Sequence, residues 1–134
     1  MARKRHLSRI AVMQTLFEHG SRAIDSAASL ERNCAGQAGE ADIDFAKNLL
    51  KGVLEKEEDI RLIVQEHAPG WTLERMDPVS RYTLLLGCYE LLFAKDAPPA
   101  VVMNESIEIA KEFGTAESGK FVNGVLNAIA HPQK

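Results

Sequence analysis

The sequence has little of what marks a membrane, secreted or metal-binding protein. It contains two cysteines, Cys34 and Cys88, whose separation matches no metal-ligand spacing and suits reduced thiols in a cytoplasm. No stretch approaches the roughly 18 uncharged apolar residues that a membrane span needs. The first residues are basic, but polar residues interrupt the apolar stretch after them and no small-residue cleavage site appears, so a signal peptide is not expected. These absences favour a cytoplasmic protein with no membrane contact.

Aromatic residues are also scarce, at 6% of the 134 residues, so aliphatic side chains must supply most of any core. With 46% hydrophobic residues, the chain suits one ordinary globular domain. No segment shows the alternation of apolar and polar residues that a half-buried strand would show. The sequence therefore predicts an all-α fold.

The apolar residues recur with helical spacing along most of the chain. Helices are expected at Leu7 to His19 with Ser8 as cap, at Ile24 to Cys34, on both sides of the acidic run Glu55–Asp59, at Val79 to Phe93, at Val101 to Phe113 and at Glu117 to Ala130. Asp77 and Pro78 supply an N-cap acid and a proline at the first helical position. The helix that they begin is apolar almost all round, so we predict that it is the most buried.

Three patterns associated with catalysis or ligand binding fail on their details. Residues 114–121, GTAESGKF, come within one residue of a phosphate-binding loop, but Phe121 stands where the magnesium-binding hydroxyl should be, and a helix precedes it instead of a strand. The four histidines share no helical face and no ligand spacing. No nucleophile signature brings serine, histidine and aspartate together. We therefore predict no enzymatic activity, no catalytic residue, no metal site and no cofactor.

Positive charge is concentrated at one end of a mildly acidic chain. The formal net charge is -3, yet residues 1–9 contain four basic residues and a histidine, with no acid among them: Arg3, Lys4, Arg5, His6 and Arg9. A cluster of this kind attracts a nucleic-acid backbone. On charge pattern alone, a solvated tail is an equally good interpretation.

The C-terminal third contains a characteristic set of residues: Pro98, Val101, Val102, Asn104, Glu105, Ala110, Lys111, Phe113, Gly114 and the run from Lys120 to Leu126. With these residues it resembles the most characteristic stretch of the NusB family of transcription antitermination factors. The N-terminal helix and the middle of the chain resemble the family too. Two positions depart from it, since Ser80 and Leu85 stand where the family usually has an acid and an arginine. Ser80 is expected to change a surface contact, and Leu85 to replace a polar interaction by packing.

The resemblance implies a single domain over residues 1–134, with about seven helices arranged as two packed small helical bundles. NusB proteins bind a single-stranded RNA element called boxA in leader transcripts, notably those of ribosomal RNA operons. They do so with a small ribosomal-subunit protein, NusE, and the pair helps the RNA polymerase complex to read through terminators. Some relatives form homodimers, and the sequence leaves self-association open.

The resemblance also implies an RNA site made of two parts. The first holds Arg3, Lys4, Arg5 and Arg9 as phosphate contacts with His6 among them, and the second holds Glu117, Gly119, Lys120 and Phe121. Phe121 beside Lys120 offers a stacking surface next to a charge, although its spacing fits helical burial equally well. Glu117 is expected either to temper RNA affinity or to favour a first helical turn. Gly119 has the alternative of permitting a turn and close helix packing.

Two other functional classes stay open at this point. One is a helical protein–protein adaptor that binds no RNA. The other is a detached domain of an rRNA cytosine methyltransferase, because some of these enzymes carry a NusB-like domain at their N-terminus. The second alternative requires a separate or truncated product, since 134 residues leave no room for a methyl-donor domain.

Overall fold

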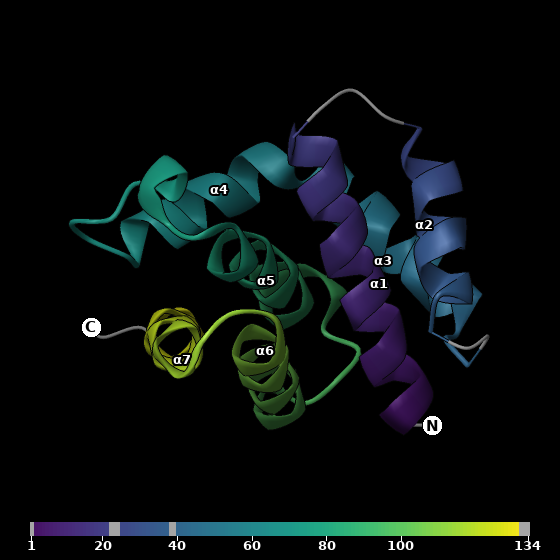
Figure 1. Cartoon of the computed structure of the whole chain (residues 1–134). Coiled ribbons are helices and arrows are strands. Elements are labelled where there is room, and N and C mark those ends of the chain that lie inside the picture. The colour runs from purple at the N-terminus through teal and green to yellow at the C-terminus, as the bar shows by residue number, and fades with distance from the viewer. Residues whose placement is uncertain (1, 22–24, 38–39, 132–134) are drawn as a thin grey trace. The chain divides into compact units, whose positions relative to one another are not determined.

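The computed structural model describes residues 2–21, 25–37 and 40–131, and they form helices joined by short loops (Figure 1). Within these ranges the seven α-helices are α1 (Ala2–Ser21), α2 (Ser26–Ala35), α3 (Ile43–Glu55), α4 (Glu57–Glu66), α5 (Pro78–Tyr89), α6 (Pro99–Phe113) and α7 (Ala116–Ala130). A 3₁₀ turn, η1 (Leu73–Arg75), precedes α5, and a π-helical turn, η2 (Glu90–Ala94), follows it. Over these described ranges there is no strand, and the predicted all-α class is confirmed.

Contacts along the backbone divide the chain into two compact units, Met1–Gly52 and Val53–Lys134. In the first unit α1 packs on α2, and in the second α5 packs on α4, α6 and α7. Two units agree with the expected pair of small bundles, while a single domain over residues 1–134 stays a prediction. No helix among the described residues is long and apolar enough to cross a membrane.

Helix α1 begins earlier than predicted, and Ser8 is not its cap. Arginine and lysine are good helix formers, so the helix extends back through the basic residues to Ala2. Ser8 lies fully buried inside the helix, where its Oγ donates to the Lys4 carbonyl oxygen at 2.7 Å. The same Oγ accepts from the Asp42 backbone N–H at 2.7 Å. The basic residues near the N-terminus therefore belong to a helix and not to an irregular tail.

Helix α5 forms the centre of the second unit, as predicted. Asp77 is its N-cap, with Oδ1 accepting from the Ser80 backbone N–H at 2.9 Å, and Pro78 is in the first turn. Every residue from Ser80 to Cys88, apart from Arg81, is buried. The predicted helix ends differently, because residues 90–94 form the π turn and Phe93 is exposed.

The two departures from the family pattern both lie inside the second unit. Ser80 is fully buried, and its Oγ donates to Asp77 Oδ2 at 2.7 Å. The expectation that Ser80 changes a surface contact is therefore wrong, because this short side chain turns back onto the cap of its own helix. Leu85 is 1% exposed and packs in the core, as expected.

The two cysteines are free and buried. Burial raises the pKa of the Cys88 thiol to about 12. Burial also raises the pKa of Cys34, and nearby Lys47 opposes that shift. Both thiols are thus protonated at neutral pH, which makes them poor nucleophiles and poor metal ligands.

Candidate nucleic-acid interface

The N-terminal basic cluster (Arg3, Lys4, Arg5, His6 and Arg9) is ordered on α1, and its members differ in exposure. Arg3 and Lys4 are exposed, and Arg5 and His6 are partly buried. Arg9, by contrast, is only 3% exposed. The charged groups at the start of α1 therefore face solvent, whereas the charged group of Arg9, one to two turns later, does not.

Arg5 and Arg9 share one face of α1, as their spacing of four predicts. Both guanidinium groups lie over the ring of Phe45 in α3, at 4.5 Å for Arg5 and 5.1 Å for Arg9. A cation over an aromatic face is attracted by the ring quadrupole. Arg9 thus helps to hold α3 against α1, and its burial makes an RNA contact a weaker prediction for Arg9 than for Arg5.

Arg3 forms an ion pair with Glu40, with 3.3 Å between Nε and Oε1. Both side chains are largely exposed, at 71% and 50%. Exposed pairs of this kind contribute little to stability, so the pair can exchange for a phosphate at small cost. Arg3 therefore stays available to contact the phosphate backbone of an RNA.

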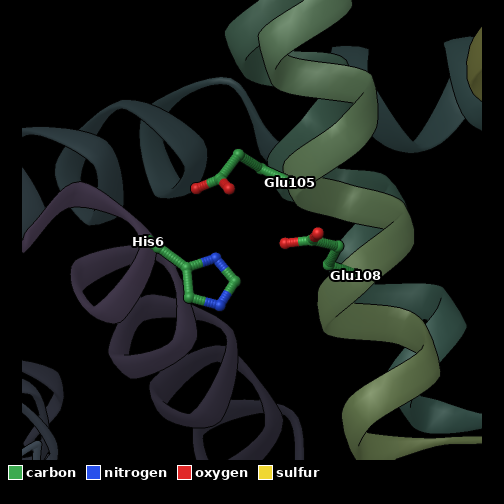
Figure 2. Close-up of side chains that lie close together, drawn as sticks. All are labelled: His6, Glu105 and Glu108. Carbon is green, nitrogen blue, oxygen red and sulfur yellow. The ribbon is translucent and has the colours of Figure 1, made fainter. Parts of the chain in front are cut away.

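Figure 2 draws one histidine and two glutamate side chains from the two units. His6 projects from α1 in the first unit, and Glu105 and Glu108 leave α6 in the second unit on the same side of that helix. Residues three apart on a helix share a face, which explains the common direction of the two acids. Glu105 and Glu108 thus place two carboxyl groups on one face of α6.

Glu117, Gly119, Lys120 and Phe121 all lie in the first turns of α7. Thr115 is the N-cap, and its Oγ1 accepts from the Ser118 backbone N–H at 3.2 Å while Ser118 Oγ accepts from the Thr115 backbone N–H at 3.2 Å. This capping box starts the helix at Ala116. The helix thus begins one residue before the predicted Glu117, and Glu117 occupies the first helical turn, where an acid is favourable.

Phe121 is partly buried and makes an edge contact with Trp71. The two ring centroids are 5.7 Å apart with 63° between the ring planes, and Trp71 is 50% exposed. The rings border a hollow of about 360 Å³, which we call the aromatic hollow. Its lining residues are Trp71, Met76, Asp77, Thr115, Glu117, Ser118 and Phe121. Phe121 is thus neither a full core residue nor a free side chain, which combines the two interpretations that its spacing left open.

The loop before α5 fixes Trp71 at the edge of this hollow. Gly70 has a φ of +86°, in the region that favours glycine, and turns the chain after α4. The Gln65 side-chain amide then donates to the Trp71 carbonyl oxygen, and its Oε1 accepts from the Leu73 backbone N–H. The sequence patterns did not assign Trp71 to the site. The signal available was a lone tryptophan directly after a Pro-Gly turn.

Gly119 lies inside α7, at a point where this helix approaches α6. It is buried, and a Cβ at this position would collide with the Lys111 side chain of α6. Its missing side chain lets α7 lie close to α6, so the structure supports the packing alternative. An RNA contact by Gly119 stays an untested prediction.

Glu117 and Lys120 lie side by side at the exposed rim of the hollow, with 3.7 Å between Oε1 and Nζ. Both side chains are mostly solvent-exposed, at 84% and 78%. The carboxylate offsets part of the positive charge that Lys120 presents. The rim therefore has less attraction for an RNA backbone than the lysine alone would give it.

Replacing Glu117 by glutamine is expected to tighten RNA binding by about two- to fivefold, the effect of one screened surface charge. The gain should shrink as salt is added, because the repulsion that it removes is electrostatic. Fluorescence anisotropy with a labelled RNA at several salt concentrations measures this. Glu112→Gln, a like change at an exposed acid of α6, is the control. Unchanged or weaker binding by Glu117→Gln would contradict the tempering role.

Comparison with known proteins identifies the family of this chain. The NusB family model matches residues 6–131. The chain belongs to the NusB family. It is 40% identical over 126 residues to the transcription antitermination protein NusB of Bacillus licheniformis, covering 94% of this chain and 95% of that one. The predicted resemblance is confirmed, and the protein is a NusB transcription antitermination factor.

Solved NusB structures share the fold. Thermotoga maritima NusB superposes with a TM-score of 0.84 at 38% identity, covering 94% of this chain and 89% of that chain. A crystal structure of the antitermination factors NusB and NusE in complex with double-stranded RNA contains a chain that matches with a TM-score of 0.86 at 27% identity. The match covers 97% of this chain and 98% of that chain. NusB antitermination factors are non-enzymatic, in agreement with the expectation drawn from the missing catalytic motifs.

Proposed function

We propose that this NusB protein binds boxA-type single-stranded leader RNA in the cytoplasm, together with the small ribosomal-subunit protein NusE. The pair would help the RNA polymerase complex to read through terminators in ribosomal RNA operons. The observation that carries the proposal is the pair of partly exposed rings, Trp71 and Phe121, beside exposed Lys120. The complex of a related chain with NusE and double-stranded RNA supports the part of the proposal that concerns NusE and RNA as partners.

The aromatic pair suits an unpaired base. Single-stranded RNA is recognised by splayed bases that stack on aromatic side chains, at about 1–3 kcal/mol per base. Trp71 is half-exposed and Phe121 partly so, so both rings keep surface for a base. Lys120 at the rim then meets the neighbouring phosphate, which sets the position of the strand but not its sequence.

The N-terminal basic cluster supplies the longer-range attraction. Arg3, Lys4 and Arg5 lie within one turn of α1 and retain access to solvent. Each phosphate that a basic side chain neutralises releases counterions from the RNA. Binding through this cluster is therefore expected to depend strongly on salt and little on sequence.

Replacing Arg3 or Lys4 by alanine should weaken binding to every RNA sequence alike. It should also reduce the slope of log affinity against log salt concentration by about 0.7 for each phosphate of a single strand that is no longer neutralised. Titrations of labelled RNA at four or more salt concentrations give this slope. Lys47→Ala, an equal loss of charge at an exposed lysine of α3, is the control. A wild-type slope in both Arg3→Ala and Lys4→Ala would remove the phosphate role of the cluster.

NusE is expected to form a complex with this chain, and the pair should bind boxA RNA more tightly than either protein alone. Titration calorimetry and gel filtration with purified NusE test complex formation, and gel filtration of the chain alone reports any homodimer. RNA affinity is then measured with and without NusE. A NusE complex on which RNA has no effect would favour the adaptor alternative. Absence of both the complex and RNA binding would refute the proposed function.

A further inference from the structure

We propose that the aromatic hollow selects a base that presents N–H donors on its edge, guanine above all, and that Asp77 is the residue that determines this preference. The inference rests on the proposed function, because it requires that RNA reaches this surface. It adds to that function the identity of the preferred base and the residue that recognises this base.

The walls of the hollow favour a base over a phosphate. Asp77 and Glu117 place two carboxylates on the lining, while Thr115 and Ser118 already use their hydroxyls in the capping box of α7. A phosphate group would be repelled by the two acids. The apolar part of the lining, Trp71 and Phe121, has ring planes 63° apart, and a base can stack on the face of one ring, so a nucleobase suits both the apolar and the acidic part of the lining.

Asp77 is held in place by neighbouring donors and retains the capacity to accept more. Its Oδ1 accepts from the Ser80 backbone N–H at 2.9 Å, and its Oδ2 accepts from Ser80 Oγ at 2.7 Å and from Ser118 Oγ at 3.4 Å. An ionised carboxylate has about four acceptor sites and no donor. Asp77 is exposed and lines the hollow, so the remaining acceptor site is open to a ligand, and the long 3.4 Å contact from Ser118 Oγ can give way to a second ligand donor. A preorganised acceptor of this kind recognises donors and rejects other acceptors.

The four RNA bases differ in what they offer such an acceptor. The Watson–Crick edge of guanine carries two adjacent donors, the N1 imino and the N2 amino groups, which match a carboxylate. Uracil presents its one imino donor between two carbonyl oxygens, which a carboxylate repels. Adenine and cytosine each present one amino group next to a ring acceptor. Good base-edge contacts discriminate by about 1–3 kcal/mol, so guanine is expected to be preferred and uracil to bind least.

Trp71 allows this to be measured directly, because it is the only tryptophan of the chain and borders the hollow. The probes are three eight-nucleotide RNAs: oligouridine, the same strand with one central guanosine, and the same strand with inosine there, which lacks the exocyclic amine. Titrations follow the quenching of Trp71 fluorescence. The guanosine strand should bind roughly tenfold tighter than oligouridine, with the inosine strand between them.

Two variants remove the same charge from different places in the hollow. Asp77→Asn keeps an N-cap side chain that can accept from Ser80 and should bring the guanosine-to-uridine ratio below about twofold. Glu117→Gln, at the rim, should strengthen all three strands alike and leave the ratio unchanged. Thermal unfolding of each variant confirms that it is folded.

Three results would overturn the inference. One is equal affinity of the wild type for guanosine and uridine strands, and another is an unchanged ratio in folded Asp77→Asn. The third is an equal loss of the ratio in Glu117→Gln, which would make net charge the cause. If no strand quenches Trp71 while the NusE pair still binds boxA RNA, the base site is wrong and the proposed function stands. If RNA binds in neither assay, both fail.

Discussion

Replacing Leu84 by alanine is expected to reduce the free energy of unfolding by about 2–5 kcal/mol. Leu84 is 0% exposed and lies in the middle of α5, which packs on α4, α6 and α7. Truncation removes buried methyl groups and leaves a cavity that the surrounding helices fill only in part. Against a typical total stability of about 5–15 kcal/mol, this is a large loss. Urea denaturation followed by circular dichroism measures it.

Two comparisons sharpen this test. Leu62→Ala changes the same residue type on α4, but Leu62 is 66% exposed, so the change should stay within about 0.5 kcal/mol. Leu91, which the sequence placed in the same buried helix, is partly exposed within the π turn. Leu91→Ala should therefore reduce the free energy of unfolding by less than Leu84→Ala does. Equal losses in Leu84→Ala and Leu62→Ala would show that α5 is not the centre of the second unit.

Replacing Phe121 by alanine is expected to weaken RNA binding by about 1–3 kcal/mol, through the loss of a stacking surface. The slope of log affinity against log salt should remain nearly that of the wild type, because no charge is removed. This separates Phe121 from Arg3 and Lys4, whose replacement should change the slope. Titrations of boxA RNA over a range of salt concentrations give both quantities for the same variant.

Packing must be distinguished from stacking, since Phe121 is partly buried against Trp71. Phe121→Leu keeps much of the apolar bulk and loses the ring, whereas Phe121→Tyr keeps the ring. If stacking holds the RNA, the tyrosine variant binds like the wild type and the leucine variant does not. Equal affinity of the two, or a loss that follows the fall in melting temperature alone, would argue for a purely structural Phe121.

Local patterns predicted most of the helices because their causes are local. Asp77 and Pro78 start α5 through contacts within a few residues, and both could be recognised in the sequence. Ser8 was misplaced because its partner, Asp42, is 34 residues away and the pattern around Ser8 does not reveal it. A hydroxyl that suits a cap also suits a buried helical position once a distant backbone group satisfies it.

The site was predictable to a smaller extent, for the same physical reason. The family resemblance pointed to Lys120 and Phe121, but the ring that faces Phe121 belongs to Trp71, far away in sequence. Arg9 lies over the ring of Phe45, which belongs to a different helix. Charge in a sequence shows which residues can meet a phosphate, and only the packing shows which of them face the solvent.

The position of Arg5 and Arg9 over Phe45 has a consequence for conformational entropy. A free arginine side chain loses about 1.5–2 kcal/mol of rotamer freedom when it is immobilised. Arg5, resting on the ring at 4.5 Å, has given up part of that freedom before any RNA arrives. Lys4 is exposed and, among the described residues, rests on no such ring, so it is expected to lose more freedom on binding. The basic end of α1 would thus bind an RNA strand through one preorganised side chain, Arg5, and one mobile side chain, Lys4.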